Sequence, residues 1–180
     1  RQFGIPMGPM ELADEAGIDV GYHVAQILEC AYGERMHVAE ILKTVYEAGT
    51  LGKKSGEGFY IYTGRQKKVS NNVRKMCKKN AFTLNDDITL KRLIYVMINE
   101  ASRCLEEGVV DSASTIDVGM IYGTGFPPFR GGLLRYADSV GAKHIVANLK
   151  EFQARFDQHR FEPSQLLLSM ANTNGTFYPS

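Results

Sequence analysis

The sequence has little of several features that define particular classes of protein. It contains three cysteines, Cys30, Cys77 and Cys104, among 180 residues, and this odd number at irregular spacing is typical of neither a disulfide framework nor a metal cage. Its formal net charge is +1, so no global field favours nucleic acid or an acidic membrane surface. No apolar run approaches the roughly 20 residues needed to cross a bilayer. We therefore expect a reducing compartment, no nucleic-acid partner and no transmembrane segment.

The most informative feature that is present is an internal repeat. The first copy reads Phe3-Gly4-Ile5-Pro6-Met7-Gly8-Pro9 and then Asp14-Glu15-Ala16-Gly17. The second copy reads Tyr122-Gly123-Thr124-Gly125-Phe126-Pro127-Pro128 and then Asp138-Ser139-Val140-Gly141. Both run from a Gly/Pro-rich turn through a short helical segment to Asp-x-x-Gly. A duplicated module predicts two structurally similar halves that pack together.

The repeated aspartates and glycines are candidate structural positions. Asp14 and Asp138 each stand three residues before a glycine, Gly17 and Gly141, at a predicted helix end. A carboxylate at such a place most often accepts backbone N–H groups from the start of the following helix. We therefore favour a structural role for both aspartates over direct catalysis.

Helical periodicity dominates the chain and predicts an all-α protein. Glycines and capping residues divide it into helical segments. Only residues 59–62, after the glycine-rich loop 51–58, have the aromatic and β-branched composition of a strand. The longest expected helix, residues 87–107, has Asn99 on its outer face and an apolar face made of Leu90, Leu93, Ile94, Met97, Ala101, Cys104 and Leu105. The expected helices cover residues 9–17, 19–33, 37–48, 87–107 and 112–120, with others after Arg130, Gly141 and Pro163.

A basic segment divides the two copies. Residues 65–79 contain seven lysines and arginines and no acidic residue. We predict two helical subdomains, residues 1–64 and 88–180, joined by a solvated linker over residues 65–87. The alternative is that this segment attracts a phosphorylated ligand such as coenzyme A.

The sequence lacks a complete motif for a cofactor or a metal. Gly52-Lys53-Lys54 fails the phosphate-binding loop pattern, and Pro128 replaces the third glycine of a dinucleotide fingerprint that would begin at Gly123. No strand precedes Gly123, so the context of a dinucleotide site is also missing. The four histidines have no metal-ligand spacing: His23, His37, His144 and His159. We expect this chain to hold neither a cofactor nor a metal.

These motifs together resemble a known family. Residues 3–20 and Leu51-Gly52-Lys53-Lys54-Ser55-Gly56-Glu57-Gly58-Phe59-Tyr60-Ile61-Tyr62 are similar to the closing part of the L-3-hydroxyacyl-CoA dehydrogenase C-terminal domain. Residues 99–108, 123–138 and 161–178 resemble the extra copy of that domain in the multifunctional fatty-acid oxidation enzymes. The resemblance implies two tandem all-α subdomains of the 6-phosphogluconate dehydrogenase C-terminal-like type. It also implies that they pack as a pseudo-dimer and that the first copy is truncated.

The resemblance implies an NAD-dependent enzyme that oxidises L-3-hydroxyacyl-CoA to 3-ketoacyl-CoA, with an enoyl-CoA hydratase upstream. The family's catalytic His, Glu and Asn would then precede Arg1. In the second copy, Lys91-Arg92 stands where the family has a catalytic Asn-Arg pair, so that copy is expected to be silent. The start at Arg1-Gln2 rather than at Met also indicates part of a longer protein. We expect the chain alone to be inactive and to bind no NAD.

Two roles for the chain remain open. In the first, the stiff apolar turn Pro6-Met7-Gly8-Pro9 lines the acyl-CoA cleft. In the second, the chain is a non-catalytic helical module that braces neighbouring domains or a thiolase subunit. The resemblance fits a bacterial cytoplasm best, with mitochondrial and peroxisomal locations as alternatives; the ending Tyr178-Pro179-Ser180 is no peroxisomal tripeptide.

Overall fold

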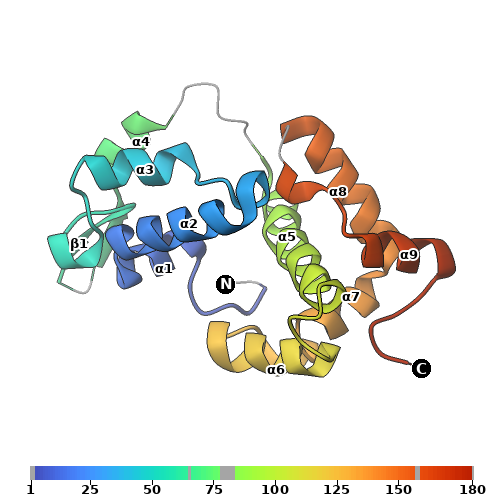
Figure 1. Ribbon diagram of the computed structural model, residues 1–180. Helices are drawn as coiled ribbons and strands as arrows, with labels where there is room; N and C mark the ends of the chain where they lie inside the picture. Colours follow the sequence, from blue (N-terminus) through green and yellow to red (C-terminus); the bar gives the residue numbers. More distant parts are fainter. Residues whose placement is uncertain (1–2, 65, 78–83, 157–158, 180) are drawn as a thin grey trace. The chain divides into compact units, whose positions relative to one another are not determined.

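The computed structural model describes residues 3–64, 66–77, 84–156 and 159–179. The chain forms two compact units. Unit 1 runs from Met7 to Thr83, and unit 2 comprises Gln2–Pro6 and Leu84–Ser180. Helices dominate both units (Figure 1), which confirms the predicted all-α class; the described residues add one two-stranded sheet.

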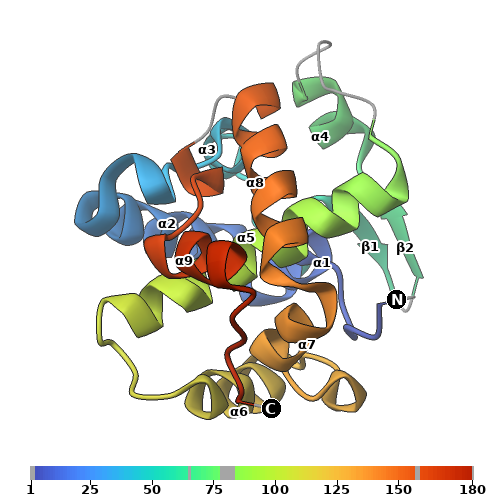
Figure 2. The ribbon, with the colours of Figure 1, turned by 90° about the vertical axis from the view of Figure 1, so that its right-hand side faces the viewer.

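The described residues of unit 1 form four α-helices, two short 3-10 helices and a hairpin. The helices are α1 Pro9–Ala16, α2 Ile18–Tyr32, α3 Glu40–Glu47 and α4 Asn71–Met76, with the 3-10 turns η1 Gly33–Met36 and η2 Lys53–Ser55. Strands β1 Tyr60–Thr63 and β2 Gln66–Val69 pair antiparallel (Figure 2). In this pairing, Tyr60 lies opposite Val69. Among the described residues of this unit, the buried apolar side chains that form its core are Ile18, Val45 and Val73.

The segment that we predicted to be a linker differs in the structure. Residues 66–69 form β2, and Ser70 begins α4 by accepting the Val73 N–H with its hydroxyl at 3.1 Å. Val73 is buried in the core of unit 1. The prediction weighed the high charge of this segment. It missed that two valines, Val69 and Val73, supply an apolar strand end and an apolar helix face.

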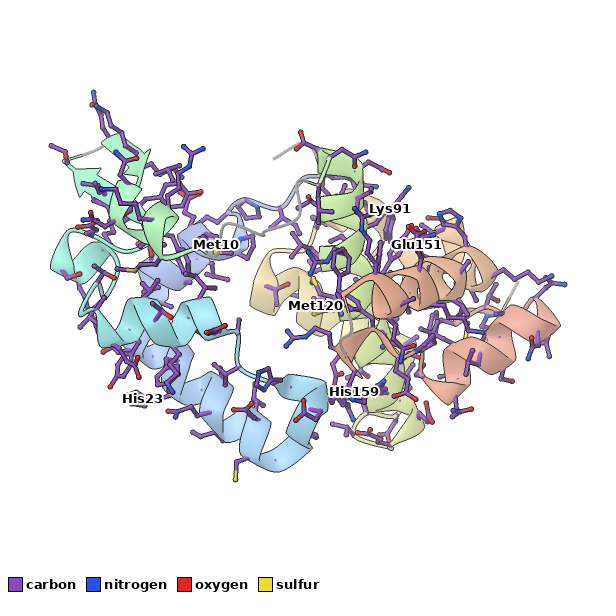
Figure 3. The ribbon with its side chains drawn as sticks, turned by 90° about the horizontal axis from the view of Figure 1, so that it is seen from above. Met10, His23, Lys91, Met120, Glu151 and His159 are labelled. Atoms are coloured by element: carbon purple, nitrogen blue, oxygen red, sulfur yellow. The ribbon has the colours of Figure 1, made fainter. Side chains whose placement is uncertain are left out.

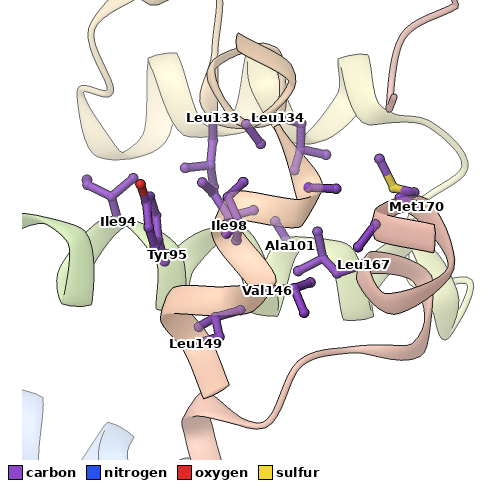
Figure 4. Close-up of a cluster of buried hydrophobic side chains, with 14 of the residues drawn as sticks. Ile94, Tyr95, Ile98, Ala101, Leu133, Leu134, Val146, Leu149, Leu167 and Met170 are labelled. Atoms are coloured by element: carbon purple, nitrogen blue, oxygen red, sulfur yellow. The ribbon is translucent and has the colours of Figure 1, made fainter. Parts of the chain in front are cut away.

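The part of unit 2 that the structure describes forms five α-helices and two 3-10 turns. The elements are α5 Asp86–Glu106, α6 Ala113–Thr124, η3 Pro128–Arg130, α7 Leu133–Val140, α8 Ala142–Phe156, η4 His159–Phe161 and α9 Gln165–Thr173. Helix α8 packs against α5, α7 and α9. Figure 4 shows the large core between these helices, which includes Ile98, Leu133, Leu149 and Leu167.

The buried face of α5 differs by about one residue position from the predicted one. Leu93 is exposed, whereas Asn99, which we placed on the outer face, is buried. Its side-chain oxygen accepts the Ser164 N–H at 2.9 Å, and its amide nitrogen donates to the Glu162 carbonyl at 2.8 Å. Asn99 lies in the predicted helix, but a polar side chain was expected to face solvent. It can be buried because backbone groups distant in sequence form hydrogen bonds with its amide.

The first described residues belong to unit 2. Phe3 is buried there, with its ring edge-on to Phe126 at 5.7 Å and to Tyr136 at 5.2 Å between centroids. The Arg130 guanidinium lies 4.0 Å from the centre of the Phe3 ring and its Nε donates to the Phe3 carbonyl at 3.0 Å. We had placed this segment in the first subdomain, because the order of residues along the chain gives no sign that it packs in unit 2.

Candidate functional site

A buried carboxylate organises unit 1. Asp14, on α1, is 1% exposed and accepts the backbone N–H groups of Phe59 at 2.8 Å and Tyr60 at 2.9 Å. The Tyr62 hydroxyl donates to the same carboxylate at 3.0 Å. A side chain at Gly58 would overlap the Asp14 carboxylate, so only glycine allows this approach. Asp14 thus ties α1 to the start of β1.

Unit 2 repeats the arrangement around Asp138. This carboxylate accepts the N–H groups of Phe177 at 2.8 Å and Tyr178 at 3.0 Å. The Tyr178 hydroxyl donates to a different carboxylate, Asp117, at 2.7 Å. Asp117 also accepts the Leu134 N–H at 2.6 Å and so caps the start of α7. Each aspartate of the repeat therefore binds the Phe-Tyr pair of its own copy.

The donors differ from those that we expected. They lie 45 and 46 residues after Asp14 and 39 and 40 residues after Asp138, not at the start of the next helix. The Phe-Tyr pair that recurs in both copies was the sequence feature that could have identified these donors. Because these carboxylates already accept several hydrogen bonds, their geometry suits structural support better than proton abstraction.

The glycines of the repeat end the short helices. Gly17 and Gly141 have φ values of 97° and 89°, and their N–H groups bond to the carbonyls of Ala13 and Ala137. L-residues rarely adopt such angles, so glycine is required for the turn between consecutive helices.

The tyrosines that donate to these carboxylates have raised pKa values. Burial, and then the hydrogen bond that the Tyr62 hydroxyl donates to Asp14, hold the pKa of Tyr62 well above its ordinary value. Burial and the bond to Asp117 raise the pKa of Tyr178 to about 12. The Arg135 guanidinium lies 3.6 Å from the centre of the Tyr178 ring. Both phenols therefore stay protonated at neutral pH and act as donors.

The predicted acyl-lining turn lies at the surface. Pro6, Met7, Gly8 and Pro9 are all exposed, and Met7 is 36% exposed. Pro6 belongs to unit 2, and the other three to unit 1. Their contact with an acyl chain remains a prediction.

A polar hollow in unit 1 holds a pair that sequence reasoning missed. It has a volume of about 410 Å³ and lies beside Tyr22, Lys43 and the C-terminal half of α2. His37 Nδ1 lies 2.5 Å from Glu29 Oε1, which also accepts the Val38 N–H at 3.1 Å. The turn η1 brings the two side chains together. In the sequence, only Gly33 indicated that the chain turns between Glu29 and His37. The His37 side chain is 60% exposed, so this pair lies at the surface.

The Lys91-Arg92 pair of α5 has structural contacts. Lys91 forms an ion pair with Asp87 at 2.6 Å. The Arg92 guanidinium lies 4.1 Å from the centre of the Phe156 ring and 5.4 Å from that of Phe161. Burial lowers the pKa of Arg92, and the charges of nearby arginines lower it further.

One face of α2 is apolar and exposed. Its stripe consists of Val20, Val24, Ile27 and Ala31. When α2 and α8 are aligned on Gly17 and Gly141, the matching residues of α8 are polar: His144, Asn148, Glu151 and Arg155. Figure 3 labels Glu151 on α8. We call the α2 residues the apolar stripe.

Two kinds of site were not found within the described ranges. They contain no group of three or more His, Cys, Asp or Glu side chains placed to hold a metal ion. None of their helices combines the length and the hydropathy of a membrane span.

Comparison with known families decides what this architecture is. The family model described as 3-hydroxyacyl-CoA dehydrogenase, C-terminal domain, matches residues 1–62 and 89–176. The chain belongs to this family. The resemblance inferred from the motifs is therefore confirmed.

Two similar curated proteins are bacterial. Fatty acid oxidation complex subunit alpha of Shewanella loihica is 43% identical over 180 residues, which covers 98% of this chain and 25% of the relative. The protein of the same name from Vibrio parahaemolyticus is 39% identical over 177 residues, with the same coverage. The chain thus spans about a quarter of the length of these relatives.

Solved structures support the fold. The dehydrogenase part of multifunctional enzyme 1 from C. elegans is 27% identical with a TM-score of 0.64, covering 93% of this chain and 39% of that one. The 3-hydroxybutyryl-CoA dehydrogenase from Escherichia coli has a TM-score of 0.74 and 22% identity, covering 95% of this chain and 52% of that one. The second comparison bears on the fold alone.

Proposed function

We propose that this chain is the C-terminal part of a multifunctional fatty-acid oxidation enzyme. Its dehydrogenase would oxidise L-3-hydroxyacyl-CoA to 3-ketoacyl-CoA with NAD, and an enoyl-CoA hydratase would precede it. The observation that supports this most is the 43% identity to a fatty acid oxidation complex subunit alpha over 98% of the chain. We propose a bacterial cytoplasmic location, since the relatives are bacterial; mitochondria and peroxisomes remain alternatives.

Within that enzyme the chain would support the acyl-CoA cleft rather than perform the chemistry. Hydride transfer needs a held nicotinamide and a base, and we assign both to groups upstream of Arg1. The Asp14 and Asp138 carboxylates are already bound to backbone N–H groups, which fits a supporting role.

The proposal is tested by following NADH absorbance with acetoacetyl-CoA. A longer protein that includes the upstream domains should reduce acetoacetyl-CoA to 3-hydroxybutyryl-CoA as NADH is oxidised. The 180-residue chain should show only background. Turnover by the chain alone would disprove the assignment of the reactive groups, and an inactive long protein would disprove the dehydrogenase itself.

The cleft role rests on the exposed turn at Met7. In the longer protein, Met7→Asp should raise KM or lower kcat by about tenfold, since about 1.4 kcal/mol of lost contact has that effect. The matched control is Leu12→Asp, which adds the same charge at an exposed apolar position of α1. Unchanged kinetics for Met7→Asp would exclude the turn from the cleft.

The second candidate is a helical interaction module, and the apolar stripe of α2 favours it. Exposed apolar side chains on one helix face mark interaction surfaces. We propose that the stripe is covered in the assembled protein, by the other copy in a pseudo-dimer, by a neighbouring domain or by a thiolase subunit. Size-exclusion chromatography of the longer protein tests this with Ile27→Glu, which should weaken assembly; Glu151→Gln on α8 is the control.

A further inference from the structure

Helix α6 carries apolar residues on two opposite faces. On the inner face, Ala113, Ile116 and Met120 pack against the core of unit 2. Figure 3 labels Met120, and Figure 2 shows α6 at the edge of the unit beside α7, against which it packs. On the outer face, Val118 is 55% exposed and Tyr122 is 86% exposed. The outer face of a surface helix is normally polar, and a helix that is apolar all round is normally buried.

The outer face of α6 also has no charge near it. Among residues 112–129 the only charged residue is Asp117, whose side chain is buried. Gly119 and Gly123 lie beside Val118 and Tyr122 and are exposed, so another helix can approach the backbone closely there. Exposed apolar and aromatic side chains without charged neighbours are typical of the centre of a protein–protein interface.

The first described residues of the chain lie at the C-terminal end of α6. Phe3 packs against Phe126, which follows the end of α6 by two residues. A side chain on Gly4 would come within 2.8 Å of the Phe129 ring. Any residues that precede Phe3 in a longer protein therefore begin beside α6.

The repeat predicts what those upstream residues form. The matching helices α1 and α7 begin 124 residues apart, at Pro9 and Leu133, and α2 and α8 have the same spacing, from Ile18 to Ala142. Helix α6 has 12 residues and ends at residue 124. The same spacing places its counterpart in the 12 positions directly upstream of Arg1.

We propose that this upstream helix packs on the outer face of α6, so that equivalent faces of two copies of one helix meet. In such an isologous contact each surface pairs with its own equivalent. Phe3 and Phe126, the first aromatic residues after the two helices, already pack against each other in this way. The short connection through Phe3 also gives the upstream helix a high effective concentration at α6, which a separate partner lacks. The proposal rests on the proposed function only for the presence of the upstream residues.

Cross-linking in the longer protein identifies the occupant of this face. Tyr122→Cys is coupled to benzophenone maleimide, and Val109→Cys is the matched control, because Val109 is 64% exposed in the turn after α5. After illumination, peptide mass spectrometry should join the probe at position 122, but not that at position 109, to the 12 residues upstream of Arg1. A link from position 122 to another domain, to a second chain or to a thiolase subunit would overturn the choice of occupant. The absence of any link would overturn the contact itself.

Hydrogen exchange tests the same contact without a chemical probe. The amides of α6 should exchange about tenfold more slowly in the longer protein than in the 180-residue chain, because a covered helix exchanges only when it opens locally. The amides of α9, in the same unit, should change much less. Equal slowing in both helices would indicate general stabilisation of unit 2 and would overturn the specific contact.

A pair of charged substitutions locates the effect on α6. Val118→Glu should abolish the slower exchange of α6 in the longer protein, whereas Val109→Glu should preserve it. Both valines are exposed in the 180-residue chain, so circular dichroism should show that both variants of that chain are folded. Equal effects of the two substitutions would contradict the proposed place of packing.

The dehydrogenase assay gives a separate result. A longer protein that oxidises NADH with acetoacetyl-CoA but is not cross-linked from position 122 would overturn the helix pair and leave the proposed function intact. A longer protein that is cross-linked to the upstream helix but is inactive would overturn the dehydrogenase and leave the helix pair intact.

Discussion

Helices α2 and α8 are the same element in two copies of one module, yet their outer faces differ. In α2 that face carries the apolar stripe, of which Ile27 is 67% exposed. In α8 the matching position is the charged Glu151, which is also exposed. The polar face of α8 is suited to water. The apolar stripe of α2 is of the kind that mediates contacts between protein surfaces.

The cores of the two units differ as well. Helix α8 packs against α5, α7 and α9, whereas α2 packs against α1, α3 and the turn η1. Among the described residues, unit 1 has no counterpart of the long helix α5. Its buried apolar side chains are accordingly few, and the Asp14 cluster has a larger share in holding the unit together.

The largest expected effect is the loss of stability on removal of the Asp14 carboxylate. Asp14→Ala leaves three donors without an acceptor and should destabilise unit 1 by about 4 kcal/mol. Asp138→Ala, at a less buried carboxylate, should cost unit 2 about 2 kcal/mol. Urea unfolding followed by circular dichroism, with hydrogen exchange to assign the unit, measures both. Asp14→Asn keeps an acceptor and should cost less than Asp14→Ala. Equal losses at the two aspartates would contradict the importance that we give to Asp14 in unit 1.

The next prediction concerns the aromatic residue at the start of the chain. Phe3→Ala should destabilise unit 2, rather than unit 1, by about 3 kcal/mol, because it empties a packed site between Phe126 and Tyr136. Hydrogen exchange should show the loss in α6 and α7. Phe129→Ala is the control: this ring is 76% exposed, so its removal should change the free energy of unfolding by less than about 0.5 kcal/mol. Faster exchange confined to unit 1 would argue against the contact.

High pH should weaken the tyrosine contact of unit 2. The pKa of Tyr178 is about 12 in the folded protein and about 10 when the chain is unfolded. The protonated phenol therefore stabilises the fold fully below pH 10, and this contribution is lost as the pH rises from 10 to 12. Urea unfolding at several pH values should show this decline, and Tyr178→Phe should make it shallower. A decline of the same slope in Tyr178→Phe would assign it to other groups.

The smallest effect is expected at the apolar stripe. Val24→Asn and Ile27→Glu transfer the residues of α8 to α2. Since both positions are exposed, each change should alter the stability of the isolated chain by no more than about 0.5 kcal/mol. Thermal unfolding measures this. A loss of several kcal/mol would mean that the stripe is already part of a packed core.

Local patterns were enough to predict most helices and their ends. Pro9 at the first turn of α1, Gly17 and Gly141 at helix ends, and the capping serine Ser112 act over a few residues, so their effect can be recognised without a fold. Strand β2 and the burial of Val73 on α4 were missed because the positive charge of residues 66–77 indicated a solvated linker.

The sequence by itself determined the helical class, the duplication and the family, because periodicity, capping and ordered motifs are local properties of the chain. Only the tertiary structure decided which groups meet: Asp14 with Phe59 and Tyr60, His37 with Glu29, and Phe3 with the core of unit 2. These contacts join residues that are distant in sequence or separated by a turn. Their partners are selected by the packing of whole helices, which no short segment specifies.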